Sequence, residues 1–504
     1  MGLAVVASRA QVGVQAPAIA VEVHISGGLP MTHIVGMPET AVKESRDRVR
    51  AAILNARLEY PAGKVTVNLA PADLPKEGSR FDLAIALGIL AASGQIPADR
   101  LAQHEFLGEL ALSGALRAIH GVLPAAIRCG EAGRTLIVPS GNGQEAALAS
   151  RTPALAADSL LAVCRYLRDG KGLVDAADTP AAAPVDPGPA PPDLADVRGQ
   201  VRARRALEIA AAGGHNLLMT GPPGSGKTLL ATCLPGILPP LAQDDALAVA
   251  AIASVAGKPP RLGDAFLVPT YRAPHHTASA VALVGGGSMP RPGEISLAHC
   301  GVLFLDELPE WSRVVLEVLR EPLESGRIVI SRAARQSEFP ARFQLVAAMN
   351  PCPCGYAGDP SGRCRCSAEA IARYRARLSG PLLDRIDLHV DVPRLPQNEL
   401  LSSGGGEASV AVRERVSRAR AIQQQRSGIC NARLPLPDLK RIAALGDAER
   451  SLLEHAAERM DLSARACHRI MKVARTVADL ADSDAIAIPH LAEAISYRSQ
   501  GGPG

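Results

Sequence analysis

Short apolar runs alternate with amphipathic helical patterns in the first third of the chain. The runs "AIAVEVHIS" (residues 18–26) and "KVTVNLAP" (residues 64–71) have the β-branched content and the period of two that are typical of strands. Between them, "ETAVKESRDRVRAAILNA" (residues 39–56) repeats its apolar residues at helical spacing. This alternation predicts an α/β domain, which we place at residues 1–173.

Apolar runs in the middle of the chain are continuous rather than alternating. Such runs are "NLLMT" (216–220), "GVLFLDEL" (301–308), "RIVIS" (327–331) and "FQLVAAMN" (343–350). Continuous apolar character is typical of strands that are buried on both faces of a parallel sheet. With the helical patterns between them, these runs predict a second α/β domain over residues 193–400.

Two segments of low apolar content separate these regions. Residues 174–192, "VDAADTPAAAPVDPGPAPP", are rich in proline and alanine, which favours an extended spacer. A glycine-rich break, "LSSGGGEAS", covers residues 401–409. Only helical patterns follow it up to Tyr497, which predicts a C-terminal helical lid over residues 401–504.

Composition adds limits to this picture. A chain of 504 residues with 47% apolar residues is long enough for several cores, and its net charge of +4 predicts no broad basic surface. Because no long apolar run and no leader-like N-terminus occur, we expect a cytoplasmic protein that has no membrane partner. Ten cysteines in an intracellular protein indicate packing, metal or redox roles rather than a disulfide framework.

A complete phosphate-loop motif follows the run "NLLMT" and precedes a helical pattern. Its residues are Gly221, Pro222, Pro223, Gly224, Ser225, Gly226, Lys227 and Thr228. The glycines let backbone N–H groups face phosphate oxygens at a helix N-terminus, the lysine adds a positive charge, and the threonine hydroxyl can ligate Mg²⁺. The motif therefore predicts binding of ATP with Mg²⁺.

Carboxylates and an amide end the next two apolar runs. We expect Asp306 to hold Mg²⁺ through a water, and Glu307 to orient and polarise the attacking water. Asn350 ends the following run, and its amide can both donate and accept hydrogen bonds to position that water. We expect these residues to form one catalytic site with Lys227.

Four cysteines cluster directly after Asn350, in "NPCPCGYAGDPSGRCRC". Cys352, Cys354, Cys364 and Cys366 can satisfy a tetrahedral Zn²⁺ completely, and the glycines and prolines between the pairs allow the chain to turn back. The Cys-x-Cys spacing is tighter than the usual two-residue gap. Packed free thiols and a redox pair therefore remain open beside a structural Zn²⁺.

These motifs resemble those of AAA+ ATPases. The strings "YRAPHHTASAVALVGGG", "FPARFQLVAAMNPCPCGYAGDP" and "GPLLDRIDLHV" resemble more narrowly the magnesium-chelatase-like branch called YifB or ComM. The resemblance implies that Arg385 is an arginine finger that reaches the ATP of a neighbouring subunit, in a homo-hexameric ring. It also implies that Arg465 is a sensor that reports the γ-phosphate to the lid.

The first domain resembles the proteolytic domain of Lon, in "APADLPKEGSRFDLAIALGIL" and "LGELALSGALRAIHGVLP". Alignment with the Lon pattern places Arg80 where that family has its nucleophile and Leu123 where it has its activating lysine. Ser79 lies one residue early, which re-aims its side chain. We therefore expect a Lon-like fold without peptidase activity, as a hexamerisation or DNA-channel module.

Basic residues indicate the substrate. Arg332 and Arg335 lie near the tip of a predicted hairpin, which in this branch faces the ring pore, and "VRERVSRARAIQQQR" (412–426) forms an arginine-rich helix. Both features suit a phosphate backbone, although arginines on a helix are often only solvated. His275 and His276 have no evident third metal ligand, so we expect a structural or pore-loop role for them.

Three functions remain in competition. The resemblance to ComM implies a DNA translocase or branch-migration helicase in recombination during natural transformation, with branched or single-stranded DNA and a recombinase as partners. The alternative is a motor like the magnesium-chelatase I subunit, which drives metal insertion through a partner subunit. A Lon-like protease is the third, and Arg80 and Leu123 argue against it.

Overall fold

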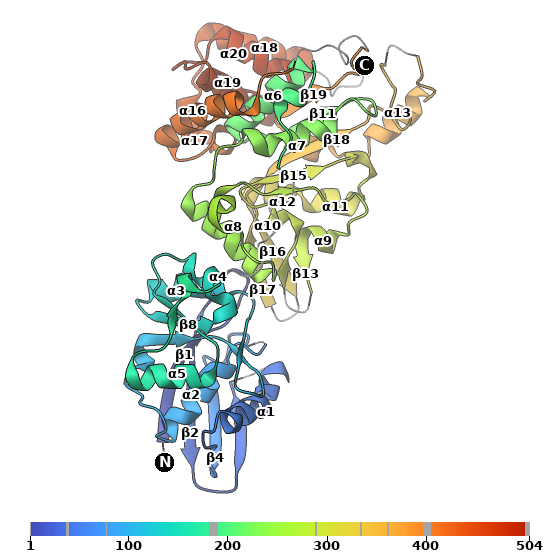
Figure 1. The fold of residues 1–504 in the computed structure, drawn as a ribbon. Helices are drawn as coiled ribbons and strands as arrows, with labels where there is room; N and C mark the ends of the chain where they lie inside the picture. Colours follow the sequence, from blue (N-terminus) through green and yellow to red (C-terminus); the bar gives the residue numbers. More distant parts are fainter. Residues whose placement is uncertain are drawn as a thin grey trace.

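The chain forms three regions that follow one another in space as they do in sequence (Figure 1). The computed structural model describes residues 2–36, 40–76, 78–180, 190–287, 290–332, 335–359, 362–396 and 405–498. An N-terminal α/β region lies below a central α/β region in this view, and a helical region covers the top (Figure 1). The predicted fold class, with two α/β regions and a helical C-terminal region, is confirmed.

The N-terminal region is built on an eight-stranded mixed sheet, in the order β10-β9-β8-β5-β1-β2-β4-β3. The strands are β1 (Gly2–Arg9), β2 (Ala18–Ser26), β3 (Met31–Val35), β4 (Lys64–Ala70), β5 (His104–Phe106), β8 (Thr135–Pro139), β9 (Ala154–Ala157) and β10 (Val174–Asp175). Alternate residues of β2 and β4 are buried, which matches the period of two in their sequences.

Helices cover this sheet and close its core. They are α1 (Thr40–Asn55), α2 (Asp82–Ala92), α3 (Val122–Glu131), α4 (Gly143–Ala147) and α5 (Leu160–Asp169). Helix α2 is apolar on nearly all sides and is almost wholly buried. A short hairpin, β6 (Glu109–Leu110) with β7 (Leu116–Arg117), lies beside it.

The predicted spacer, residues 174–192, is described only in part. Strand β10 and the 3-10 turn Ala176–Asp178 complete the N-terminal sheet, and a second turn, Leu194–Asp196, begins the next region. Residues 181–189 lie outside the described part of the chain.

The central sheet has five parallel strands in the order β12-β15-β18-β11-β19. They are β12 (Tyr271–Arg272), β15 (Val302–Leu305), β18 (Gln344–Met349), β11 (Leu217–Thr220) and β19 (Leu388–Asp391). Strands β15 and β18 are buried along their whole length, which explains their continuous apolar sequences.

One predicted strand lies elsewhere. The run "RIVIS" forms β16 (Arg327–Arg332), which pairs with β17 (Arg335–Pro340) in an antiparallel hairpin and not with the parallel sheet. Ile328 and Ile330 of β16 pack with Phe339 of β17 into the core beneath the sheet, so the apolar run reflects packing against the domain. A second small hairpin joins β13 (Gly285–Gly286) to β14 (Arg291–Pro292).

The central helices are α6 (Val201–Gly213), α7 (Lys227–Ile237), α8 (Gln243–Val255), α9 (Ala280–Val284), α10 (Glu294–Leu297), α11 (Arg313–Val318), α12 (Arg320–Ser325), α13 (Ala368–Arg375) and α14 (Gly380–Leu383). The C-terminal helices are α16 (Ser409–Ser427), α17 (Leu436–Ile442), α18 (Asp447–Met460), α19 (Ala464–Leu480) and α20 (Ile488–Ser496). Helices α16 and α19 pack on α6 and share one apolar core with the sheet. No strand occurs in the described C-terminal residues, 405–498.

The N-terminal and central regions touch through helices α3 and α8 (Figure 1). Ala250 and Ala251 of α8 pack into the apolar cluster that contains Val122 and Leu123 of α3. The Gly121 amide donates to the Ser254 carbonyl at 3.2 Å. Along the residues that the structure describes, no helix has the length and apolarity that crossing a bilayer requires.

Candidate active site

The carboxyl ends of three neighbouring strands bring the predicted site residues together. Strands β11, β18 and β15 are parallel neighbours, so the phosphate loop after β11, Asn350 after β18 and Asp306 after β15 meet at one edge of the sheet. This edge is where ligands bind in open parallel sheets. The strand order therefore assembles a site from residues that are far apart in the sequence.

The phosphate loop has the backbone that its glycines allow. Gly224 and Gly226 have φ angles of 74° and 95°, in the left-handed region that a side chain disfavours, and α7 begins directly afterwards at Lys227. The Lys227 ammonium donates to the carbonyls of Gly221 (2.7 Å) and Pro222 (2.9 Å). Burial lowers the pKa of Lys227. The loop thus holds a cation at a helix N-terminus, as phosphate binding requires.

Two oxygen ligands for a divalent cation lie side by side. The Thr228 hydroxyl donates to the Asp306 carboxylate at 2.8 Å, although the two residues are far apart in sequence. Mg²⁺ prefers such oxygen ligands and takes only one or two from the protein when phosphates complete its shell. The pair therefore fits the predicted Mg²⁺ site.

Asn350 and Glu307 flank this pair. The Asn350 side-chain oxygen accepts from Lys227 at 3.2 Å, which places the amide beside the phosphate loop. Glu307 has a φ of 50°, and its amide donates to Asp306 at 2.8 Å, so the turn after β15 directs its carboxylate outward with the side chain half exposed. Asp306 is anchored in turn, because its carbonyl accepts from the Trp311 indole at 3.0 Å.

His276 is a site residue that the sequence did not reveal. Its Nδ1 lies 3.0 Å from the Glu307 carboxylate, so it contacts the predicted water-polarising group. The sequence predicts only a structural or pore-loop role for the pair His275 and His276, because the preceding strand β12 is two residues long and shows no strand pattern. Because β12 is the parallel neighbour of β15, the chain after it lies next to Glu307.

Arg385 lies at the opposite edge of the sheet from its own phosphate loop. Its carbonyl accepts from the Asn216 side chain at 3.0 Å, and Asn216 directly precedes β11 whereas the phosphate loop follows that strand. The guanidinium pairs with Glu324 at 2.6 Å and donates to the Pro381 carbonyl at 2.6 Å. The backbone of Arg385 therefore lies away from its own phosphate loop, and its side chain is nearly buried.

Arg465 is exposed in the first turn of α19. No hydrogen bond or ion pair of this side chain occurs within the described residues, so its sensor role stays a prediction. One turn later, Arg469 pairs with Asp387 at 2.5 Å, just before β19. Arg469 therefore adds an ion pair between the lid and the end of the sheet to the apolar core that they share.

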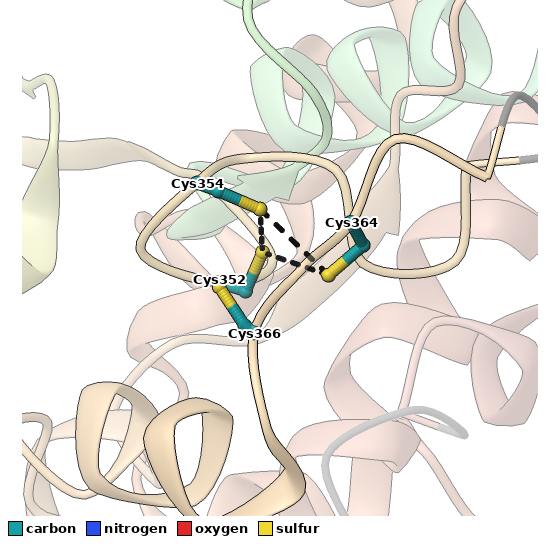
Figure 2. Close-up of side chains that lie close together, drawn as sticks. All are labelled: Cys352, Cys354, Cys364 and Cys366. Carbon is teal, nitrogen blue, oxygen red and sulfur yellow. Dashed lines mark hydrogen bonds between the residues drawn. The ribbon is translucent and has the colours of Figure 1, made fainter.

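The four clustered cysteines converge on one point (Figure 2). The sulfur of Cys352 lies 3.3 Å from that of Cys354 and 3.8 Å from that of Cys364, and the latter two are 3.7 Å apart. All four sulfurs, including that of Cys366, lie within 4.8 Å of one another. Backbone N–H groups, with that of Tyr356 having the largest effect, lower the pKa of the Cys354 thiol to about 6.

The site that resembles the Lon dyad is filled by this chain's own side chains. Arg80 is buried and donates to the Gln11 side chain (2.9 Å) and the His120 carbonyl (2.6 Å), and burial lowers its pKa to about 10. Leu123 is wholly buried. The Ser79 hydroxyl donates to the Glu109 carboxylate and has no lysine or histidine partner in the described chain.

The structure describes the side chains of only one of the two predicted DNA-binding features, the hairpin tip and the arginine-rich helix. Arg332 and Arg335 pair across the end of the β16–β17 hairpin, and their side chains lie outside the described part of the structure. The arginine-rich helix, now α16, is instead structural: Arg415 pairs with Glu208 (2.6 Å), and Arg426 with Asp479 (2.8 Å). These guanidiniums join α16 to the rest of the protein, so Arg415 and Arg426 are engaged in internal ion pairs.

Comparison with known families gives three matches along the chain. Residues 193–400 match magnesium chelatase, subunit ChlI; residues 21–142 match subunit ChlI of Mg-chelatase; and residues 406–498 match the C-terminal part of subunit ChlI.

Relatives match over almost the whole length. The chain is 52% identical over 502 residues to competence protein ComM of Haemophilus influenzae, with 99% of this chain and 98% of that protein covered. It is 50% identical to the uncharacterized protein YifB of Escherichia coli, with 99% and 97% covered. It is 44% identical to the uncharacterized protein Rv2897c of Mycobacterium tuberculosis, with 97% of each chain covered.

Proposed function

This chain belongs to the magnesium-chelatase-like family of AAA+ ATPases that includes YifB and ComM, and from that premise we propose that it is an ATP-driven DNA translocase and branch-migration helicase. Its work would belong to recombination during natural transformation, since its relative in Haemophilus influenzae is named a competence protein. The proposal depends on two features that occur together in this chain. These are an assembled ATPase edge and a full-length likeness to that protein.

The residues at this edge divide the work of hydrolysis. Bound Mg²⁺ supplies charge neutralisation at the phosphates, and Thr228 and Asp306 are placed to hold it. Lys227 brings a second positive charge to the loop. Glu307 accepts a proton from the attacking water, and Asn350 fixes that water by a hydrogen bond beside Lys227.

The remaining catalytic charge comes from a second copy of the chain. Arg385 lies at the far edge of the sheet and cannot serve its own phosphate loop, so we propose a homo-hexameric ring in which it reaches the neighbouring site. Within a subunit the guanidinium pairs with Glu324. Ring formation would exchange this exposed carboxylate for the neighbour's γ-phosphate.

DNA is favoured over protein as the substrate for two reasons. The β16–β17 hairpin ends in the paired residues Arg332 and Arg335, and basic tips suit a phosphate backbone without base specificity. The Lon-like site has buried Arg80 and Leu123 in place of a dyad. Casein degradation by the purified protein that is lost in Ser79→Ala would contradict this view.

A metal-insertion motor is the second candidate, and one observation favours it. All three matched families are named for the magnesium-chelatase subunit ChlI, and one of them covers residues 21–142. Because residues 21–142 match this subunit, the N-terminal region does not distinguish this chain from it. The DNA proposal therefore depends on the competence protein and on the hairpin.

The test is unwinding of forked DNA and branch migration of Holliday junctions with ATP and Mg²⁺. We expect the wild-type ring to displace strands and Glu307→Gln to bind DNA and ATP without displacement. ATPase activity that DNA does not stimulate, together with failure on all branched and single-stranded substrates, would favour the metal-insertion motor. A recombinase that loads the ring is a further predicted partner, detected as stimulation of unwinding.

ATP and Mg²⁺ are the cofactors of this motor. Zn²⁺ at the four cysteines is a separate proposal, which does not depend on the identity of the substrate.

A further inference from the structure

The four clustered sulfurs have the spacing of a single tetrahedral ion. For a Zn–S bond of about 2.3 Å, tetrahedral geometry separates the sulfurs by about 3.8 Å. Three of the sulfur–sulfur distances are 3.3, 3.7 and 3.8 Å. They are well above the roughly 2.05 Å of a disulfide. Because all four sulfurs lie within 4.8 Å, they fit one ion better than an iron–sulfur cluster, whose irons hold the cysteines farther apart.

Backbone N–H groups point at the sulfurs of two of these cysteines, Cys352 and Cys354. The Ala357 amide donates to the Cys352 sulfur at 3.3 Å, and the amides of Tyr356 and Arg365 donate to Cys354. Donors aimed at the sulfurs are the outer-shell contacts that orient metal ligands. The sequence between the pairs turns through Gly355 and Gly362, with φ angles of 86° and 65°. The loop is therefore shaped to present its sulfurs.

This loop also rests on the phosphate loop. A Cβ atom at Gly355 would lie 2.6 Å from Cδ and 2.7 Å from Cγ of Pro223, so only glycine fits this close contact. The cluster begins two residues after Asn350, whose side chain contacts Lys227. Fixing the four sulfurs therefore fixes both sides of the phosphate site.

We propose that Cys352, Cys354, Cys364 and Cys366 bind one Zn²⁺ in a closed tetrathiolate site, and that this ion holds the Gly355 turn against Pro223 and keeps Asn350 in its catalytic position. Four protein ligands leave no open position, so the ion is structural. Its effect on turnover is indirect and passes through the loop contact. The metal-binding part is independent of the proposed function, whereas the effect on turnover depends on its ATPase part.

Metal analysis of the full-length protein, purified after growth with zinc, tests the first part. We expect one zinc per chain, and a loss of most of it in Cys364→Ser. The matched control is Cys430→Ser, which removes a half-buried thiol outside the cluster and should retain the zinc. Zinc far below one per chain, iron in its place, or equal loss in both variants would overturn the assignment.

A second variant separates zinc binding from its effect on ATP turnover. Gly355→Ala leaves all four sulfurs in place, so zinc content should stay at one per chain. Its new methyl group pushes the turn away from Pro223, and we expect kcat for ATP to fall about tenfold, the lower end of the effect of losing outer-shell contacts. Full turnover in this variant would refute the loop contact as the link.

The two proposals fail in distinguishable ways. Stoichiometric zinc in a protein that unwinds no DNA would refute the DNA function and leave the metal site standing. Efficient unwinding by protein that never contains zinc would refute the metal site alone.

Discussion

The carboxyl edge of the central sheet and the buried cluster around Arg80 and Leu123 in the N-terminal region use their polar groups in opposite ways. At the central edge, Lys227, Thr228 and Asp306 contact one another or the loop around them, and Glu307 remains half exposed. In the buried N-terminal cluster, Arg80 donates to the Gln11 side chain and the His120 carbonyl, and Leu123 is wholly buried. The edge of the central sheet keeps charged groups available for a ligand. In the N-terminal cluster, the polar groups are engaged in internal hydrogen bonds.

Residues near Arg80 also lie at the contact between the N-terminal and central regions. The Glu145 carboxylate accepts from the Leu123 amide at 3.1 Å and from the Ser254 hydroxyl of α8. Gly257, just beyond α8, lies against the His120 ring, and the His120 carbonyl accepts from Arg80. The residues next to Arg80 therefore connect the N-terminal region to the central region. The difference between the two regions is that one leaves its polar groups available to a ligand, whereas the other uses them in internal contacts.

The largest effect is expected from Lys227→Ala, which should abolish ATP hydrolysis and leave the contact between the N-terminal and central regions unchanged. Loss of the loop cation removes the charge that binds and stabilises phosphate oxygens, so ATP turnover should fall at least about 10²-fold. ATPase kinetics and nucleotide binding measure this, with Lys171→Ala, an exposed lysine of the N-terminal region, as the control. Substantial turnover in Lys227→Ala would mean that this edge is not the working site.

Arg80→Ala should do the reverse, destabilising the N-terminal side of the joint while sparing the chemistry. Removal of the side chain leaves a cavity and deprives the Gln11 and His120 oxygens of their donor, so the N-terminal unfolding transition should lose about 2 kcal/mol of stability. Urea unfolding followed by circular dichroism measures it, and ATP binding should persist.

Arg46→Ala is the matched control for that experiment. This arginine is exposed on α1 and contacts only the adjacent Asp47 among the described residues, so its removal should change stability by less than about 0.5 kcal/mol. Equal stability of the Arg80 and Arg46 variants would show that Arg80 does not hold the N-terminal region together.

How much of this could be predicted differs between the two regions. The edge residues follow apolar runs of four to six residues, and parallel strands end at a common edge, so Asp306 and Asn350 could be placed from the sequence. The contact of His276 could not, because it depends on a two-residue strand. The arginines of α16 looked free because a sequence shows charge without partners, and Glu208 lies 207 residues from Arg415.

A small effect is expected from His276→Ala, which tests whether the contact with Glu307 contributes to turnover. The imidazole orients the half-exposed Glu307 carboxylate, and a partly exposed pair of this kind contributes up to about 1 kcal/mol, or roughly fivefold in rate. We therefore expect kcat to fall three- to fivefold, within about that limit, while nucleotide affinity is unchanged. His275→Ala, whose ring nitrogen contacts Thr277, should keep the wild-type rate. Similar losses in both variants would remove His276 from the site.

The central claim is that each hydrolysis site joins Glu307 of one subunit to Arg385 of the next, and mixing two inactive variants tests it most directly. Glu307→Gln and Arg385→Ala should each bind ATP without turnover. In an equal random mixture, about one quarter of the junctions carry both intact groups, so ATPase activity should return to roughly that fraction of wild type. A mixture that stays inactive, or an Arg385→Ala protein that hydrolyses ATP as a monomer, would contradict the account.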